Sequence, residues 1–232
     1  LAAALLASLG HPARAANYTD MWWNAGESGW GLTITHHDDK VFAVWYVYDE
    51  AGRPLWVHMS NGIVSADGRS VTGKVYHTTG PSYRDPDFRW SRVTVTPVGD
   101  ARIDFADDET ATVTYSVLGR TITKTLTRLP FGSAPANAPV DQGDLWWNPD
   151  EAGWGLTINQ HGDNLFGVWY TYDLDGRPLW IGLMGGDFQG NAFTGPLYTT
   201  TGTPYTQPFV AADTKRTQVG VATIVFEGAP AR

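Results

Sequence analysis

The stretch Trp22-Trp23-Asn24-Ala25-Gly26-Glu27-Ser28-Gly29-Trp30-Gly31 decides how this chain is organised, because it returns as Trp146-Trp147-Asn148-Pro149-Asp150-Glu151-Ala152-Gly153-Trp154-Gly155. The similarity extends beyond the motif, since residues 21–62 and 145–186 are identical at 24 of 42 positions without a gap. Chance does not produce such agreement, so the chain contains two copies of one structural unit. Ten of the 11 Trp residues fall in matched pairs, and only Trp90 has no counterpart.

Within each copy, short runs of alternating apolar and polar residues are separated by turns that contain Gly or Asp. This alternation is typical of β-strands, and no segment has a convincing helical period. In the first copy, strands are expected near residues 30–37, 41–48, 54–60, 70–78, 91–98, 101–106, 111–117 and 121–128. The sequence therefore predicts an all-β protein of two tandem antiparallel meander domains, each a barrel or a sandwich of about eight strands.

The first residues look like a targeting segment. An apolar run over residues 1–10 is too short to span a bilayer and is followed by Ala13-Arg14-Ala15, which matches a signal-peptide cleavage pattern. We expect residues 1–15 to be a partial signal peptide of a secreted or periplasmic protein without a transmembrane segment; a buried N-terminal helix is the alternative. Residues 16–128 then form the first repeat domain, the Pro-, Ala- and Gly-rich residues 129–142 a linker, and residues 143–232 the second repeat domain.

The second copy ends before its last strands. Ala222-Thr223-Ile224-Val225-Phe226 matches Ala101-Arg102-Ile103-Asp104-Phe105, and two more expected strands follow that point in the first copy. An unpaired edge is an aggregation liability. We therefore expect this sequence to be a fragment, with a genuine open edge in the second domain as the alternative.

Composition argues against several kinds of function. The chain of 232 residues has a formal net charge of −8 and no Cys. The acidic balance does not suit nucleic-acid phosphates, and the lack of Cys excludes disulfides, thiol chemistry and Cys-based zinc sites. Of His36, His37, His58 and His77, only His37 has a His counterpart, so no metal site is expected. We also find no phosphate loop, nucleophile elbow or cofactor motif.

The second copy resembles a known kind of repeat. Its motif at residues 146–155, followed by Trp169-Tyr170-Thr171-Tyr172-Asp173 and Gly176-Arg177-Pro178, is similar to a repeat of uncharacterised exported bacterial proteins. The resemblance covers nearly all of the chain after residue 15, but it brings no reaction, substrate or catalytic residue. The strand order is also similar to that of avidin-like and lipocalin-like barrels, a likeness of fold that does not establish function.

The repeated Trp residues form the most informative candidate site. Trp45 and Trp56 lie on the second and third expected strands, and the second copy retains them as Trp169 and Trp180. A four-residue turn between these strands places both Trp residues of a copy on one face, whereas a three-residue turn with a glycine bulge mixes the faces. We favour the four-residue turn and predict one aromatic platform per domain, with core packing as the alternative.

Glu27 and Glu151 lie between the Trp pair and the Gly-Trp-Gly turn, within reach of the predicted platforms. Either carboxylate could bind a ligand hydroxyl or act as a general acid. A structural role, in which each caps backbone N–H groups or pairs with Arg53 or Arg177, is the preferred interpretation. A glycosidase needs two neighbouring carboxylates, and the sequence brings no second acid beside them, so no catalytic residue is assigned.

These features predict an exported Trp-rich binding module for a carbohydrate or a small aromatic ligand. The predicted ligand-binding residues are Trp45, Trp56, Glu27, Trp169, Trp180 and Glu151. One alternative is a hydrolase that uses Glu27 and Glu151 as acid and base. Another is a structural or adhesive module of a bacterial surface protein, in which the Trp residues serve as packing. The sequence does not indicate the oligomeric state.

Overall fold

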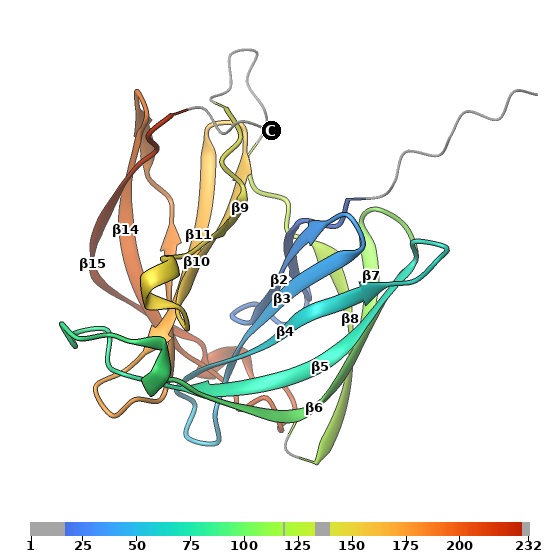
Figure 1. The fold of residues 1–232 in the computed structure, drawn as a ribbon. Coiled ribbons are helices and arrows are strands. Elements are labelled where there is room, and N and C mark those ends of the chain that lie inside the picture. Colours follow the sequence, from blue (N-terminus) through green and yellow to red (C-terminus); the bar gives the residue numbers. More distant parts are fainter. Residues whose placement is uncertain (1–16, 118, 133–139, 229–232) are drawn as a thin grey trace, which may run out of the picture.

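The computed structural model describes residues 17–117, 119–132 and 140–228, so the expected signal peptide lies outside the described residues. The described chain forms two β-sheets that lie against each other (Figure 1). Its helices are three short 3₁₀ segments, Trp90–Arg92, Pro149–Glu151 and Ala211–Asp213. In this part of the chain, no helix combines the length and the apolar character needed to cross a bilayer. The predicted all-β class is confirmed.

The first repeat forms a closed barrel of eight antiparallel strands in up-and-down order. Its strands are β1 (Asp20–Trp23), β2 (Gly31–His37), β3 (Lys40–Tyr48), β4 (Pro54–Val64), β5 (Ser70–Thr79), β6 (Thr94–Phe105), β7 (Thr110–Val117) and β8 (Arg120–Arg128). The barrel closes where β8 pairs with β1. Of the two architectures that the sequence left open, the first repeat adopts the barrel.

Two of the expected strands are a single strand in the structure. β6 covers most of residues 91–98 and 101–106, and its register against β5 shifts between Val75 and Tyr76. At this bulge an added Cβ on Gly99 would lie 1.8 Å from the carbonyl oxygen of Ser116, so only Gly fits. The eighth strand is instead β1, which has four residues and is too short for its alternation to be recognised in the sequence.

The second repeat forms an open sheet with the same strand order. Its strands are β9 (Asp144–Trp146), β10 (Gly155–His161), β11 (Asn164–Tyr172), β12 (Pro178–Met184), β13 (Asp187–Gln189), β14 (Ala192–Thr201) and β15 (Lys215–Val225). β12 and β13 pair with successive parts of β14, as the single strand β4 pairs with β5. The described residues include no counterparts of β7 and β8, so this sheet lacks its last strands, as predicted.

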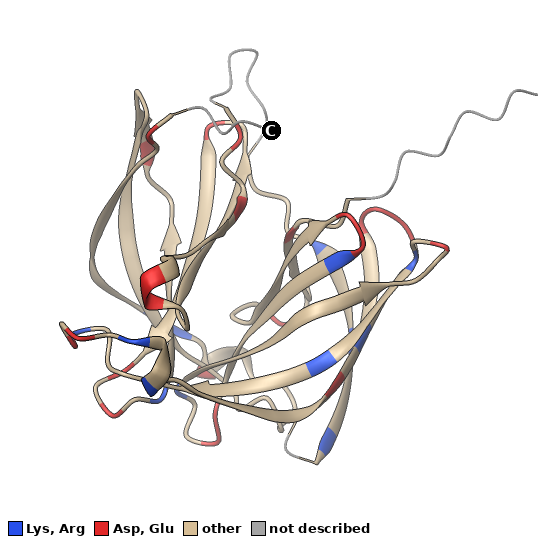
Figure 2. Ribbon diagram, viewed as in Figure 1, with Lys and Arg blue, Asp and Glu red and all other residues tan. Residues whose placement is uncertain are grey.

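The barrel interior is filled by inward-pointing side chains of alternate strand residues. Trp22, Leu32, Trp45, Met59 and Leu126 are all 0% exposed in this core. Acidic residues gather in the loops at the ends of both sheets (Figure 2). Because side chains fill the barrel, a ligand site has to lie outside its core.

The outer faces of the two sheets pack against each other. β3 and β4 of the barrel face β11 and β12 of the open sheet. The residues that form this buried apolar cluster are Met21, Val44, Tyr46, Tyr48, Trp56, Val168, Tyr170, Tyr172 and Trp180. The central strands β3 and β11 are therefore covered on their outer faces by the other repeat.

Backbone hydrogen bonds between the repeats occur in matching pairs. The N–H of Gly80 donates to the carbonyl oxygen of Gly176 at 3.1 Å, and the N–H of Gly202 donates to that of Gly52 at 3.2 Å. Gly52 and Gly176 have φ values of 72° and 76°, and an added Cβ on them would lie 2.9 and 2.8 Å from the facing carbonyl oxygens. Both the conformation and the close contact thus require Gly. This reciprocity relates the repeats like the subunits of a two-fold dimer.

Candidate functional site

The prediction that Trp45 and Trp56 share a strand face is wrong. β3 pairs with β4 so that Trp45 lies opposite Val57, and Tyr46 lies opposite Trp56. Because cross-strand partners point to the same side, the two Trp side chains lie on opposite faces. The predicted platform of two adjacent indoles is therefore not formed.

The alternative three-residue turn with a glycine bulge, in the loop of residues 49–53, sets this register. The N–H of Asp49 donates to the carbonyl oxygen of Arg53 at 2.9 Å, and Gly52 has a φ of 72°. Compared with the expected four-residue turn, it shifts the register by one residue, which exchanges the two faces of a strand. The Asp49 carboxylate holds the loop by accepting hydrogen bonds from the N–H of Ala51 at 2.9 Å and from Nε of Arg53 at 2.8 Å. Burial raises the pKa of Asp49, but its hydrogen bonds outweigh burial and leave that pKa below its usual value. This Asp has a structural role.

Trp45 and Trp169 are packing residues. Trp45 is 0% exposed inside the barrel, where its ring lies 5.8 Å from that of Tyr115 on β7. Trp169 is half-buried and contacts Tyr83 edge-on at 5.7 Å. In the second repeat, too, Trp169 and Trp180 lie on opposite faces.

Trp56 and Trp180 are anchors that reach from one repeat into the other. The indole Nε1 of Trp56 donates to the carbonyl oxygen of Thr171 at 2.8 Å, and Nε1 of Trp180 donates to that of Val47 at 3.1 Å. The two side chains are only 2% and 4% exposed. Large rings that are buried with a satisfied polar atom stabilise interfaces. Their first role is therefore to hold the repeats together.

Glu27 and Glu151 make the same contact with the neighbouring turn. Trp30 donates through Nε1 to Glu27, and Trp154 donates to Glu151, both at 3.0 Å. In the first repeat, Nζ of Lys124 also lies 2.7 Å from both oxygens of Glu27. The expected Arg partners instead pair with Asp residues of their own turns. Glu27 and Glu151 thus fix the orientation of an indole, which supports the structural interpretation.

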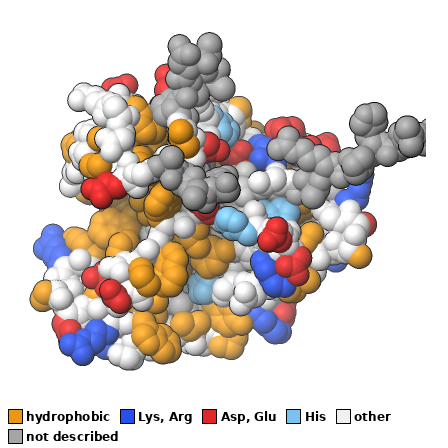
Figure 3. Space-filling view, turned by 45° about the horizontal axis from the view of Figure 1, so that its top comes forward, with side chains coloured by type: hydrophobic (Ala, Val, Ile, Leu, Met, Phe, Trp, Pro, Cys, Tyr) orange, Lys and Arg blue, Asp and Glu red, His pale blue; other side chains and the backbone are white. Residues whose placement is uncertain are grey.

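Several pockets lie along the interface between the repeats, and the largest, of about 530 Å³, has the charged side chains of Asp49, Arg53, Asp173 and Arg177 in its lining. Two others are lined mainly by aromatic and apolar side chains. The larger of these two, which we name the Arg216 pocket, has a volume of about 350 Å³. Its lining consists mainly of apolar side chains from both repeats, with a few polar groups: Met21, Trp23, Ser28, Trp30, Tyr46, Leu129, Phe166, Val168, Trp180, Met184, Thr200, Thr214 and Arg216. Figure 3 shows apolar side chains gathered over the middle of one face of the molecule.

The smaller pocket, which we name the His58 pocket, is the counterpart of the first. Its volume is about 230 Å³, and its lining includes Phe42, Trp56, His58, Thr78, Val93, Val95, Leu145, Trp147, Trp154 and Tyr170. Val95 replaces Arg216 in this pocket, and His58 stands where the second repeat has Gly182. Burial lowers the pKa of His58 to about 4. The two pockets therefore share corresponding aromatic lining residues but differ in volume and in charge.

The pockets are lined by Trp residues that the sequence did not assign to a site. Trp23 and Trp30 line the Arg216 pocket, and Trp147 and Trp154 line the His58 pocket. In the sequence, these Trp residues stand out only because they recur in both copies. Recurrence does not distinguish a core residue from a pocket residue, because the contacts of either kind of residue are not visible in a single sequence.

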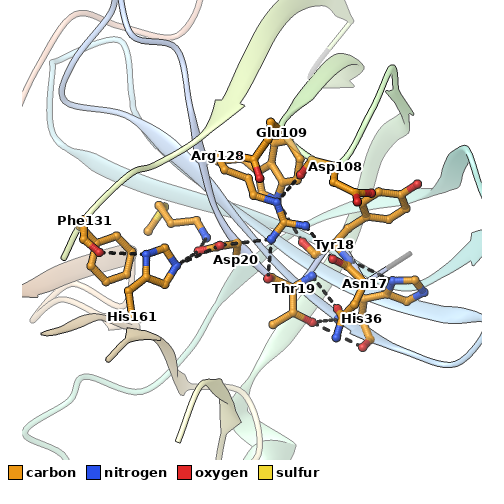
Figure 4. Close-up of polar contacts among 12 residues, drawn as sticks. Asn17, Tyr18, Thr19, Asp20, His36, Asp108, Glu109, Arg128, Phe131 and His161 are labelled. Atoms are coloured by element: carbon orange, nitrogen blue, oxygen red, sulfur yellow. Dashed lines mark hydrogen bonds and ion pairs between the residues drawn. The ribbon is translucent and has the colours of Figure 1, made fainter. Parts of the chain in front are cut away.

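At one end of the interface, each repeat supplies a His to an Asp of the other. Nε2 of His161 lies 3.1 Å from Oδ2 of Asp20 (Figure 4). Nε2 of His37 lies 2.9 Å from Oδ1 of Asp144. Arg128 also contacts Asp20 at 3.2 Å. The hydrogen bond to Asp20 raises the pKa of His161 above its usual value. Among the described residues, no group of three His, Asp or Glu side chains could hold a metal ion. Both His–Asp contacts are hydrogen bonds between the repeats.

No family model, curated protein or solved structure matches the chain. The function is therefore inferred from the geometry of the interface and of the Arg216 and His58 pockets.

Proposed function

We propose that this protein binds a small aromatic ligand with an anionic group in the Arg216 pocket. The observation that carries the proposal is an aromatic-lined pocket of about 350 Å³, at the boundary between two packed units, with one guanidinium in its lining. Small-molecule sites are typically concave and mostly apolar, lie between domains, and contain a few polar groups that orient the ligand. The Arg216 pocket has each of these properties.

The aromatic lining favours a ring. Trp23, Trp30, Phe166 and Trp180 all line the pocket, and they come from both repeats. A ligand ring placed against such side chains gains about 0.5–1.5 kcal/mol per aromatic contact beyond the burial of apolar area.

Arg216 favours an anionic substituent on that ring. Its guanidinium lies over the ring of Tyr198 at 4.6 Å, and it makes no ion pair with another described residue. A planar guanidinium binds a carboxylate or a sulfonate through two parallel hydrogen bonds. Because the chain has a net charge of −8, an anion needs a local cation of this kind.

A carbohydrate is the second candidate ligand. Trp147 is 57% exposed beside the His58 pocket and presents an indole on which a sugar ring could stack. The mainly apolar linings argue against a sugar, because buried hydroxyl groups would lack hydrogen-bond partners. A hydrolase has less support, because Lys124 and Trp30 both engage the carboxylate of Glu27. Export, expected from residues 1–15, stays a prediction.

The proposal is tested by calorimetric titration of the intact chain with 2-naphthoate and with its neutral analogue 2-naphthamide. We expect 2-naphthoate to bind about tenfold more tightly than the amide. The Arg216→Val substitution reproduces the residue of the matched pocket, Val95, and should abolish this preference. Trp30→Ala should weaken binding of both probes by about tenfold, whereas the matched control Trp154→Ala should leave it nearly unchanged.

Three results would contradict the proposal: no binding of 2-naphthoate at millimolar concentration, a preference that survives Arg216→Val, or a larger loss in Trp154→Ala than in Trp30→Ala. Cellotetraose serves as the carbohydrate probe. Binding of cellotetraose without binding of 2-naphthoate would replace the aromatic ligand class with a carbohydrate.

A further inference from the structure

The His58 pocket is lined by aromatic rings and carries no charge of its own. None of the described residues in its lining is an Asp, Glu, Lys or Arg. Because burial lowers the pKa of His58 to about 4, its imidazole is neutral near pH 7. We call the five other rings of this lining the aromatic cage, which consists of Phe42, Trp56, Trp147, Trp154 and Tyr170.

Both repeats contribute rings to the aromatic cage. The rings of Trp56 and Tyr170 meet edge-on, with centroids 5.1 Å apart and an interplanar angle of 61°. The ring of Phe42 lies 6.4 Å from that of Tyr170. Trp147 and Trp154, which flank the Pro149–Glu151 segment, supply the other two rings. The packing of the two repeats thus brings together rings from separate stretches of the chain.

The aromatic cage does not depend on the last strands of a repeat. In the barrel, β7 and β8 are both present, yet neither strand supplies a residue to the lining of the matched Arg216 pocket. Of the described barrel residues after β6, only Leu129 belongs to that lining. The rings of the His58 pocket therefore come from the part of the fold that both repeats share.

One ring of the cage is hydrogen-bonded to a carboxylate. Nε1 of Trp154 donates to Oε2 of Glu151 at 3.0 Å, and Asp150 lies beside Glu151 in the same short 3₁₀ segment (Figure 2). A carboxylate that accepts from an indole N–H makes the ring face more negative, which strengthens the attraction of the ring for a cation. The two Arg residues that precede Val93 of the lining pair with Asp residues of their own loop. The surroundings of the cage therefore favour a positively charged ligand.

The first repeat shows that this pair of side chains attracts an ammonium group. Nζ of Lys124 lies 5.8 Å from the ring centre of Trp30 and 2.7 Å from both oxygens of Glu27. Trp30 donates to Glu27 at 3.0 Å, as Trp154 does to Glu151. Lys124 is not part of the lining of the Arg216 pocket, so it leaves the inter-repeat side of the site open. The indole–carboxylate pair of the second repeat has the same chemistry for a cation.

The scarcity of hydrogen-bond acceptors in the cage favours a quaternary ammonium group. Trp, Phe, Val and Leu side chains make up most of the lining, and none of them offers an oxygen acceptor. A primary ammonium would lose its hydrogen bonds to water there, whereas a trimethylammonium group has no N–H and presents charged methyl groups to the ring faces. The volume of about 230 Å³ is below the ~300–1,000 Å³ of pockets for drug-sized ligands, so the bound group is small.

We propose that the His58 pocket is a second binding site, which takes a small quaternary ammonium compound into the aromatic cage. This site is independent of the anionic ligand proposed for the Arg216 pocket. Corresponding Trp residues line both pockets, and the exchange of Arg216 for Val95 removes the charge that would repel a cation. The duplication has thus produced two pockets that prefer ligands of opposite charge.

The test is calorimetric titration of the intact chain, near pH 7, with choline and with 3,3-dimethyl-1-butanol, which has nearly the same shape without the charge. We expect choline to bind at least about tenfold more tightly than the alcohol. Trp154→Ala should weaken choline binding by about tenfold, whereas the matched control Trp30→Ala should leave it nearly unchanged. Binding of 2-naphthoate should respond to these two variants in the opposite order, which separates this site from the Arg216 pocket.

Two substitutions at exposed positions keep the test decisive even if Trp154→Ala does not fold. Trp147 is 57% exposed and Val95 is 48% exposed. Trp147→Ala should weaken choline binding by about fivefold. Val95→Arg introduces the charge of the matched pocket and should weaken choline binding by at least about tenfold, whereas the neutral control Val95→Gln should leave it nearly unchanged.

The proposal is overturned by any of three results: no binding of choline at millimolar concentration, equal binding of choline and the alcohol, or unchanged choline binding in both Trp147→Ala and Val95→Arg. Binding of cellotetraose in place of choline, with a loss in Trp147→Ala, would assign the pocket to a carbohydrate and would also overturn it.

Discussion

Trp22 and Trp146 occupy the same place in identical Trp-Trp-Asn sequences, yet one is 0% exposed and the other 40%. Their local contacts agree, because each indole Nε1 donates at 3.0 Å to the carbonyl oxygen four residues earlier. The difference comes from β7 and β8, which cover the barrel core and have no described counterpart in the open sheet. Burial of this Trp is thus decided by strands that lie about a hundred residues away in the barrel.

The outer faces of the two repeats show no such difference. Trp56 and Trp180 are buried to nearly the same extent and make the same hydrogen bond across the interface. Each outer face is covered by the other, so both find a partner within the chain. The repeats are therefore equivalent at these two anchoring Trp residues, although the pockets beside them differ, and they are unequal in their interiors.

The largest expected effect comes from removing the indole that distinguishes the two interiors. Trp22→Ala should lower the free energy of unfolding by about 3–5 kcal/mol, because it leaves a cavity in a closed core. Trp146→Ala should cost only about 1–2 kcal/mol, because part of its ring already contacts water. Urea denaturation of the two variants measures both values.

The two substitutions are controls for each other, since they remove the same side chain from the same local sequence. Equal losses would show that the open sheet is as well packed as the barrel. The comparison between a closed core and an open one would then be wrong.

The next largest effect is a dependence of stability on pH, which comes from His58 in the smaller of the two pockets. Burial among aromatic rings lowers the pKa of His58 to about 4, from an ordinary value near 6.5. The unfolded chain binds a proton at a higher pH than the folded chain, so this residue's contribution to stability is present above about pH 6.5 and is lost as pH falls toward 4. The loss should reach about 3 kcal/mol, at about 1.4 kcal/mol per pKa unit.

The measurement is urea denaturation of the original chain and of His58→Gln at several pH values between 7 and 4. The variant should lose less stability over this range, because Gln does not titrate. Parallel pH profiles would contradict the assignment of His58 as a buried neutral group. The second repeat has Gly182 at this position and contributes no such dependence.

The smallest effect concerns the His–Asp contacts at the end of the interface. The hydrogen bond to Asp20 raises the pKa of His161, so the stabilisation is present below the unfolded pKa and is lost as pH rises through the higher folded pKa. His161→Gln should cost less than about 1 kcal/mol at pH 6, and less still at pH 8, because such partly exposed pairs are weak.

The matched substitution His37→Gln should cost even less, because the His37 side chain is 66% exposed whereas that of His161 is 30% exposed. Stability that increases with pH in the original chain relative to His161→Gln, over pH 6 to 8, would contradict the sign of this contribution.

Local patterns in the sequence predicted much of the fold. The repeat and the alternation of apolar residues indicated two antiparallel meanders and a second copy without its last strands, and the structure has both. Period-two alternation is a property of each strand alone, since successive side chains point to opposite faces. For this reason it can be recognised without knowledge of the tertiary structure.

The faces of Trp45 and Trp56 were predicted incorrectly because they depend on the register between strands. The chain adopts the three-residue turn with a glycine bulge instead of the expected four-residue turn, which shifts the register between β3 and β4 by one residue, and the sequence pattern fits either arrangement.

By itself, the sequence determined the all-β class, the duplication and the places of the recurring Trp and Glu residues. Only the tertiary structure decided that the two outer faces cover each other, that Trp56 and Trp180 anchor this contact, and that pockets lie beside them. The physical reason is that burial is a property of pairs of surfaces. The alternation of apolar residues in a strand predicts that one of its faces is buried. Which surface buries that face depends on the strand register and on how the sheets pack.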